Sequence, residues 1–155
     1  MVTSAQALKK YGDPSTKHDE GAYMTTWGVP KDIQEALSHV KFTMLGTVGF
    51  PRKIYLNKDI KSNLENALRN LITNGLATEL ISWDGCFIIR NSRGLKSWSM
   101  HAWGLAIDVN AFENGLGKEP KLSPGFVKCF TDAGFEWGGT WKSRPDGMHF
   151  QLAKI

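Results

Sequence analysis

The stretch that decides the fold class is residues 57–90, NKDIKSNLENALRNLITNGL and then, after Ala77, TELISWDGCFIIR. In its first part the apolar residues fall on one face of a helix: Ile60, Leu64, Ala67, Leu68, Leu71 and Ile72. Asn57 is a suitable cap for that helix, and Gly75 a suitable stop. In the second part the pattern of apolar residues changes from a helical to an alternating period, with two apolar runs around Asp84-Gly85. This pattern predicts a short hairpin. A helix lying across a small sheet indicates the α+β class.

Shorter elements flank this stretch on both sides. Residues 3–12 predict a helix with Thr3 or Ser4 as its cap, and residues 29–40 predict another that begins at Pro30. Residues 123–134 predict a third, capped by Ser123.

Residues 104–110 and 148–153 predict two strands. The expected architecture is a small antiparallel sheet flanked by helices. A chain of 155 residues suits one domain. We expect residues 1–50 to form a helical N-terminal lobe and residues 51–155 to form the core.

Composition narrows the class of protein. The chain is 41% hydrophobic and 22% charged, as in ordinary globular proteins, and its net charge of +4 is scattered rather than gathered in a stripe. We therefore expect no nucleic-acid binding, and we expect a monomer. The first twenty residues lack the pattern of a signal peptide, and no run is long enough for membrane insertion, so synthesis in the cytoplasm is expected. Cys86 and Cys129 have no paired spacing and are expected to be free thiols.

Strand parity places three polar side chains together. In residues 104–110, Asp108 falls on the face opposite Ile107 and Val109; in residues 148–153, His149 falls opposite Phe150. If the apolar faces pack on the long helix, Asp108 and His149 project from the uncovered face, where His101 can join them from the preceding loop.

Two neutral imidazoles and one carboxylate form a suitable zinc site with one position left open. The ion keeps a net positive charge in such a site, so it remains a good Lewis acid, and the implied chemistry is hydrolysis. A histidine beside an aspartate is more often a structural pair, and His18 and His39 are interpreted in that way.

Three further residues are candidates for catalysis. Asp146 lies in a turn three residues before His149, where its carboxylate can take a proton from water and return it to a leaving amine. Arg90, at the end of the strand CFIIR, or Arg93 just beyond it can steady an oxyanion. Taken alone, Asp146 is also a common turn former and Arg90 a common surface residue; the joint occurrence with the histidines favours the catalytic interpretation.

These residues also resemble a known family. SMHAWGLAID (99–108) followed by DGMHF (146–150) is similar to the two signature segments of the zinc D-Ala-D-Ala carboxypeptidases and L-alanyl-D-glutamate endopeptidases, a VanY-like group that includes many phage endolysins. The resemblance continues through GFEWGGTW (134–141) and backwards to IYLNKDI (54–60). It covers roughly the last hundred residues and not the first fifty.

The resemblance implies a role for each matching residue. Zinc would be held by His101, Asp108 and His149, with Asp146 as the catalytic carboxylate and Arg90 contacting the substrate carbonyl. The implied fold is the one shared by these peptidases and the hedgehog signalling domain. Ser99 and Gly104 would shape the loop, with Ser99 orienting a ligand.

The resemblance also implies peptidoglycan stem peptides as substrate, cut by an L-alanyl-D-glutamate endopeptidase of the endolysin type acting in the periplasm of a host cell. A D-Ala-D-Ala carboxypeptidase is an alternative with the same metal chemistry, and a non-catalytic hedgehog-like zinc module is a third. Four tryptophans near the motifs can wall a cleft or belong to the core: Trp98, Trp103, Trp137 and Trp141.

Overall fold

The computed structural model describes residues 1–16 and 19–155, and it confirms the α+β class. His18 lies outside the described residues. The helices are α1 (Ser4–Tyr11), α2 (Glu20–Tyr23), α3 (Lys31–Ala36), α4 (Lys61–Thr73) and α5 (Pro124–Thr131), with short 3-10 turns η1 (Ala77–Glu79), η2 (Met100–Trp103) and η3 (Gly138–Thr140). The strands are β1 (Met24–Gly28), β2 (Lys41–Phe42), β3 (Thr47–Val48), β4 (Lys53–Asn57), β5 (Ser82–Gly85), β6 (Ala106–Val109), β7 (Phe135–Trp137) and β8 (His149–Leu152).

The main sheet has six strands in the order β3-β2-β5-β6-β8-β7, and β1 pairs with β4 in a separate ribbon. All neighbouring strands of the main sheet are antiparallel except β2 and β5, which run parallel. The sheet is therefore mixed rather than purely antiparallel. Short strands such as β2 and β3 carry no readable alternation, because two residues cannot show a period.

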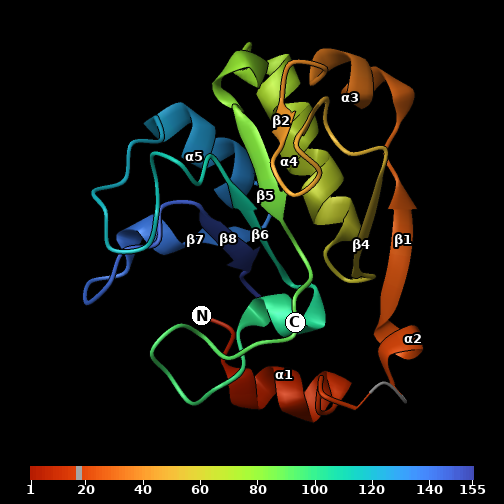
Figure 1. The fold of residues 1–155 in the computed structure, drawn as a ribbon, viewed down its shortest axis with the longest axis vertical. Helices are drawn as coiled ribbons and strands as arrows, with labels where there is room; N and C mark the ends of the chain where they lie inside the picture. The colour runs from red at the N-terminus through yellow and green to blue at the C-terminus, as the bar shows by residue number, and fades with distance from the viewer. Residues whose placement is uncertain (17–18) are drawn as a thin grey trace.

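Two hydrophobic cores lie on opposite faces of the sheet. In the first core, α4 and α5 pack against residues such as Ile107, Val109 and Phe150. In the second, α1 and η2 pack against Ala106 and the end of β8. Figure 1 shows α4 between β5 and the β1–β4 ribbon, and α1 at the opposite end of the molecule. The face of the sheet that was expected to be uncovered is thus buried by α1 and η2.

The predicted helices are confirmed with shifted ends. Thr3 caps α1 in a capping box, and Ser123 caps α5 by accepting a hydrogen bond from the Phe126 amide. Pro30 precedes α3 as its cap residue instead of opening it. Asn57 does not cap α4: it ends β4, and its fully buried amide donates to the Trp103 carbonyl oxygen at 3.0 Å.

The predicted hairpin at Asp84-Gly85 is wrong. β5 ends at Gly85, whose φ of 135° accompanies a register shift against β6, and residues 86–90 leave the sheet as a loop. The Asp84 carboxylate accepts hydrogen bonds from Ser82 and from the Ala111 amide, so it joins sheet segments instead of forming a turn. A glycine with positive φ suits a bulge as well as a turn, and the local sequence does not distinguish them.

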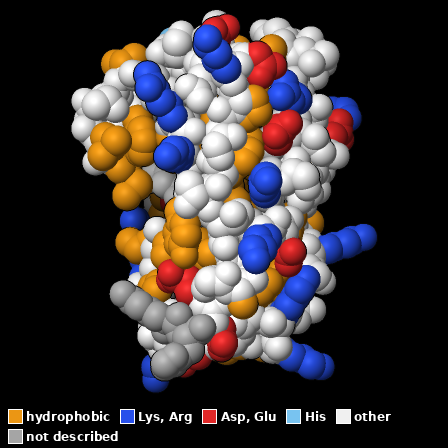
Figure 2. All heavy atoms as spheres, turned by 90° about the vertical axis from the view of Figure 1, so that its right-hand side faces the viewer, with side chains coloured by type: hydrophobic (Ala, Val, Ile, Leu, Met, Phe, Trp, Pro, Cys, Tyr) orange, Lys and Arg blue, Asp and Glu red, His pale blue; other side chains and the backbone are white. Residues whose placement is uncertain are grey.

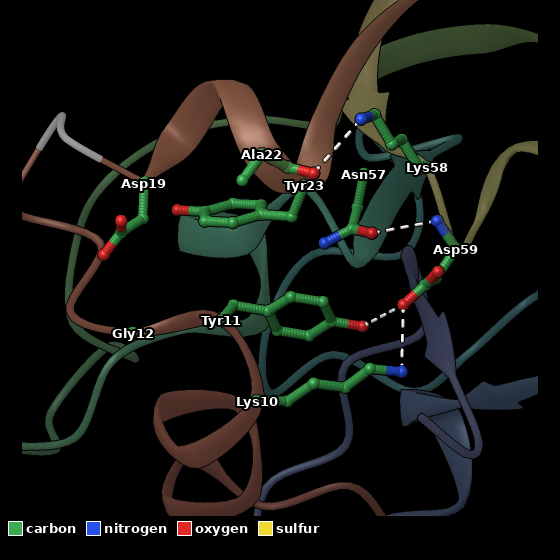
Figure 3. A pocket seen from close by; sticks show the side chains of 9 residues that line it. All are labelled: Lys10, Tyr11, Gly12, Asp19, Ala22, Tyr23, Asn57, Lys58 and Asp59. Carbon is green, nitrogen blue, oxygen red and sulfur yellow. Dashed lines mark hydrogen bonds and ion pairs between the residues drawn. The ribbon is translucent and has the colours of Figure 1, made fainter.

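The first fifty residues do more than form a helical lobe. They supply β1 to the ribbon and β2 and β3 to the main sheet, in addition to three helices. The division of the chain at residue 50 stays a prediction. Helix α1 is held at its C-terminal end by hydrogen bonds from Tyr11 (2.5 Å) and Lys10 to the Asp59 carboxylate, seen in Figure 3.

Charged side chains, the length of the helices and the cysteines can be compared with the sequence. On the face drawn in Figure 2, lysine and arginine side chains are dispersed among acidic and apolar ones. None of the described helices is long and apolar enough to cross a membrane. Cys86 and Cys129 are free and buried, which confirms the prediction, and His39 makes only structural contacts with the carbonyl oxygens of Ala77 and Leu80.

Candidate metal centre

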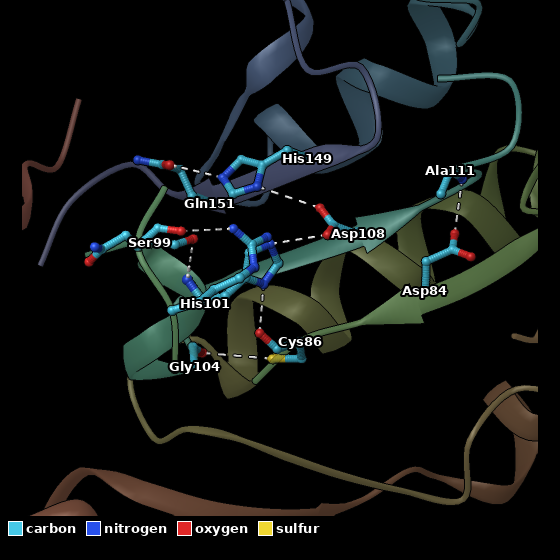
Figure 4. Close-up of polar contacts among 11 residues, drawn as sticks. Asp84, Cys86, Ser99, His101, Gly104, Asp108, Ala111, His149 and Gln151 are labelled. Atoms are coloured by element: carbon cyan, nitrogen blue, oxygen red, sulfur yellow. Dashed lines mark hydrogen bonds and ion pairs between the residues drawn. The ribbon is translucent and has the colours of Figure 1, made fainter. Parts of the chain in front are cut away.

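Neighbouring strands bring two of the expected ligands directly opposite one another. Asp108 of β6 pairs with His149 of β8 across the antiparallel ladder, so both side chains emerge at the same point on the same face. His101 reaches this point from η2. One ligand atom of each residue lies within 4.8 Å of those of the other two, a set that could hold a metal ion. Figure 4 shows the three side chains converging.

The turn that carries His101 depends on two neighbours identified in the sequence. The Ser99 side chain caps η2 by accepting a hydrogen bond from the His101 amide at 3.3 Å. Gly104 ends η2 with φ of 65°, and a Cβ there would lie 2.7 Å from the Met24 side chain and 2.8 Å from the Asn57 amide nitrogen. Glycine is required by both the backbone conformation and the close approach.

Hydrogen bonds select which nitrogen of each histidine faces the centre. His101 Nδ1 lies 2.7 Å from the Cys86 carbonyl oxygen, which can only accept, so this nitrogen carries the proton and Nε2 has a free lone pair. His149 Nε2 lies 3.0 Å from Gln151 Oε1, which leaves Nδ1 free. Oxygen acceptors behind metal-binding histidines fix the ring and the tautomer in this way.

These two nitrogens face the Asp108 carboxylate. His101 Nε2 lies 3.2 Å from Asp108 Oδ2, and His149 Nδ1 lies 3.5 Å from Asp108 Oδ1. Within the described chain, His101 Nε2 and Asp108 Oδ1 are buried and have no hydrogen-bond partner. Unpaired buried acceptors are costly unless a cation sits between them. The donor set therefore fits a metal ion such as zinc.

Electrostatics within the cluster agree with a carboxylate held in its charged form. Burial by itself would raise the pKa of Asp108, but His101 and His149 hold that pKa well below its usual range. Burial would lower the pKa of His149, and the bonded Asp108 carboxylate outweighs this effect and raises it. The cluster attracts positive charge, either protons or a metal ion.

Asp146 lines the same pocket as His101 and His149. The pocket has a volume of about 560 Å³, and its lining includes His101, His149 and Asp146. Asp146 Oδ1 is buried and lacks a hydrogen-bond partner among the described residues, and burial raises the pKa of its carboxyl group. A carboxyl group of this kind suits a general acid or base.

Close packing holds the Asp146 turn against the sheet. The Asp146 amide donates to the Gly138 carbonyl oxygen, and the His149 amide donates to the Asp146 carbonyl oxygen. A Cβ on Gly138 would lie 2.6 Å from that Asp146 oxygen and 3.3 Å from His149 Cβ. Gly138, in the stretch GFEWGGTW, thus permits the turn to approach His149 closely.

The two candidate arginines both line the pocket. Arg90 is half-buried and donates to the Asn91 carbonyl oxygen. The predicted strand CFIIR is wrong, because Arg90 lies in a loop. Arg93 is exposed, and its carbonyl oxygen accepts a hydrogen bond from Arg144. The structure keeps both as candidates.

The tryptophans divide into two kinds. Trp98 and Trp141 line the pocket, and the Trp141 ring lies 5.2 Å from that of His149. Trp103 is fully buried in the second core, and Trp137 packs on Phe150 of the first. A cleft role for Trp103 is therefore wrong, because its indole nitrogen donates to the Gly12 carbonyl oxygen at 2.9 Å.

Sequence analysis missed Gln151 and Val2, although both are buried close to this centre. The only signal was the strand parity that puts Gln151 on the face of His149.

The comparison with protein families agrees with this geometry. Residues 93–152 match the model of a family described as D-alanyl-D-alanine carboxypeptidase. The matched segment contains His101, Asp108, Asp146 and His149, and the match supports a peptidase that acts on peptidoglycan peptides. No curated protein and no solved structure matches the chain.

Proposed function

We propose that the protein is a zinc-dependent peptidoglycan peptidase that hydrolyses an amide bond of the stem peptide, as an L-alanyl-D-glutamate endopeptidase of the endolysin type. The observation that carries this proposal is the donor set: His101 Nε2, His149 Nδ1 and the Asp108 carboxylate face one point, beside Asp146. We further propose that the protein acts on the cell wall in the periplasm.

The three ligand residues would hold the zinc ion, which supplies Lewis acidity toward the scissile carbonyl and toward water. Asp146 would accept the proton of the attacking water and pass it to the leaving amine. Its raised pKa suits both halves of this transfer, because the carboxyl group must bind a proton and then release it. Arg90 or Arg93 would stabilise the negative charge that develops on the carbonyl oxygen.

The pocket lining suits a peptide substrate. Apolar side chains such as Trp98, Met148 and Trp141 share it with the charged groups. Apolar walls with a few directed polar groups are typical of sites that orient a ligand.

A D-Ala-D-Ala carboxypeptidase is the second candidate, and the description of the matching family favours it. The two activities share the metal and Asp146, and they differ in whether the cleft holds a terminal carboxylate.

The test is incubation of the zinc-loaded protein with purified muropeptides, followed by mass spectrometry. The endopeptidase releases a peptide that begins with D-Glu, with no new reducing sugar end. Release of free D-Ala alone would transfer the assignment to the carboxypeptidase. If every muropeptide stays intact while zinc is bound, the protein is a non-catalytic zinc module of the hedgehog kind. The Asp146→Asn protein and a chelated sample serve as controls.

A further inference from the structure

Residues 2–12, which comprise α1 and its flanks, lie outside the segment that matches the peptidase family. They nevertheless contact both elements that carry the histidines. The second core joins Val2, Ala7 and Tyr11 of this segment to Trp103 of η2 and Leu152 of β8. We call residues 2–12 the brace segment.

At its N-terminal end, the brace segment reaches His149 through one side chain. Val2 is 6% exposed, and its carbonyl oxygen accepts a long hydrogen bond of 3.4 Å from Gln151 Nε2. Gln151 is 4% exposed, and its Oε1 lies 3.0 Å from His149 Nε2. The Val2 carbonyl can only accept, so it orients the Gln151 amide with Nε2 toward Val2 and Oε1 toward His149.

This orientation decides which nitrogen of His149 is free. Oε1 can only accept, so in the neutral imidazole His149 Nε2 carries the proton and Nδ1 has its lone pair toward Asp108. Without the Val2 carbonyl, the Gln151 amide could turn its NH₂ group toward His149, favour the opposite tautomer, and leave Nδ1 protonated and unable to bind a metal.

At its C-terminal end, the brace segment fixes the turn that holds His101. The Gly12 carbonyl oxygen accepts from Trp103 Nε1 at 2.9 Å, and Trp103 is two residues after His101 in η2. The hydrogen bonds of Tyr11 and Lys10 to Asp59 hold this end in place (Figure 3). Both metal-binding histidines are thus positioned against one helix.

We propose that the brace segment sets the metal affinity of the centre, with Gln151 as the positioning residue that transmits its effect to His149. The proposal rests on His149 being a metal ligand, as in the proposed function, but not on the reaction catalysed. Figure 4 shows Gln151 directly behind the His149 ring, on the side away from Asp108.

The first experiment tests Gln151 by zinc affinity, measured by competition with a chromophoric chelator, and by the visible spectrum of the cobalt-substituted protein. Gln151→Met keeps the side-chain length and removes the acceptor, and we expect zinc to bind about 10- to 100-fold more weakly. Gln151→Glu restores an acceptor for His149 Nε2, and we expect it to recover the affinity and the cobalt spectrum. Wild-type affinity in Gln151→Met, or no recovery in Gln151→Glu, would overturn the positioning role.

The second experiment tests the brace segment without touching Gln151. Thr3→Ala removes the side chain that caps α1, and Ser123→Ala removes the equivalent cap of α5, which packs on the opposite face of the sheet. Each hydroxyl also donates one hydrogen bond, Thr3 to Gln6 and Ser123 to Glu79, so the two substitutions remove equivalent sets of contacts. We expect Thr3→Ala to weaken zinc binding about threefold or more, while Ser123→Ala leaves it unchanged.

Equal zinc affinities in the Thr3→Ala and Ser123→Ala proteins would overturn the coupling to the brace segment. These measurements are independent of catalysis. If no muropeptide is cut but the affinity differences appear, the proposed function fails and the brace stands. If muropeptides are cut but the affinities do not differ, the brace fails and the function stands.

Discussion

The two cores of this protein differ in what they contribute. The first, between α4, α5 and one face of the sheet, is larger and consists of apolar residues with clear helical or strand periods. The second, between α1, η2 and the other face, is smaller and adjoins the polar cluster of His101, Asp108 and His149. The first core thus holds the helices on the sheet, while the second surrounds the polar cluster.

The largest expected effect is the loss of bound metal when the polar cluster beside the second core is changed. Replacing His101, Asp108 or His149 by Ala should remove most of the bound zinc, because each supplies a bond that the other two cannot replace. His39→Ala, which changes a histidine outside the cluster, should retain it. Metal content of the purified proteins is the measurement. Full zinc retention in all three variants would show that the cluster of His101, Asp108 and His149 is not a metal centre.

A substitution at Asp146 should lower catalytic turnover without changing metal binding. Asp146→Asn keeps a residue that suits the turn, so the zinc content and the melting temperature should stay close to wild type. Muropeptide turnover should fall by about 10²–10⁴, the usual contribution of a general acid and base. Near wild-type turnover would reduce Asp146 to a turn former, and loss of zinc would make it a ligand.

The close packing of η2 against Met24 and Asn57 should make a substitution at Gly104 cost more folding free energy than one at a glycine with open space around it. Gly104 and Gly117 both have positive φ, of 65° and 81°, but a Cβ on Gly117 meets nothing within 4 Å. Gly117→Ala should cost about 1 kcal/mol of folding free energy through its backbone conformation alone. Gly104→Ala should cost about 2 kcal/mol more, because Met24 and the Asn57 amide must move. Urea unfolding of both variants tests this, and equal losses would contradict it.

The smallest expected effect concerns the hydrogen bond between Tyr11 and Asp59. Tyr11→Phe should lower the free energy of unfolding at pH 7 by about 1 kcal/mol, since Asp59 is part-exposed and keeps Lys10 as a partner. The measurement is urea unfolding at several pH values.

The pH dependence of this bond follows from the two pKa shifts. The hydrogen bond from Tyr11 and the ion pair with Lys10 lower the pKa of Asp59, so their stabilisation is present at neutral pH and is lost as the pH falls below about 4. Burial and the Asp59 contact raise the pKa of Tyr11, so its stabilisation is present below about pH 10 and is lost above that. The Tyr11→Phe protein should lose less stability than wild type at both extremes. Parallel stability curves would show that the bond contributes nothing.

Several elements could be predicted from local sequence because their signals are local. The apolar stripe of α4, the Ser123 cap of α5 and the alternation of β6 and β8 depend on neighbouring residues only. The two motif segments around His101 and His149 were likewise visible, and strand parity placed Asp108 and His149 on one face, as their pairing across the ladder confirms.

Other features depend on residues far apart in the chain. Whether Gly85 forms a turn or a bulge depends on its pairing with β6, and whether Trp103 faces a cleft or the core depends on Gly12, 91 residues earlier. The short strand β2 pairs with the edge of β5, and β3 pairs in turn with β2. No local pattern encodes such contacts.

The sequence by itself thus determined the chemistry available to this protein: two imidazoles and two carboxylates at spacings that a pair of strands can bring together. Only the tertiary structure decided how deeply these groups are buried and how their hydrogen bonds are directed. Burial by α1 and η2 and the acceptors at Cys86, Gln151 and Val2 orient the two imidazoles. They leave His101 Nε2 and Asp108 Oδ1 without a hydrogen-bond partner in the part of the chain that the structure describes. The physical reason is that side-chain type is a property of one residue, whereas desolvation and hydrogen-bond direction are properties of everything packed around it.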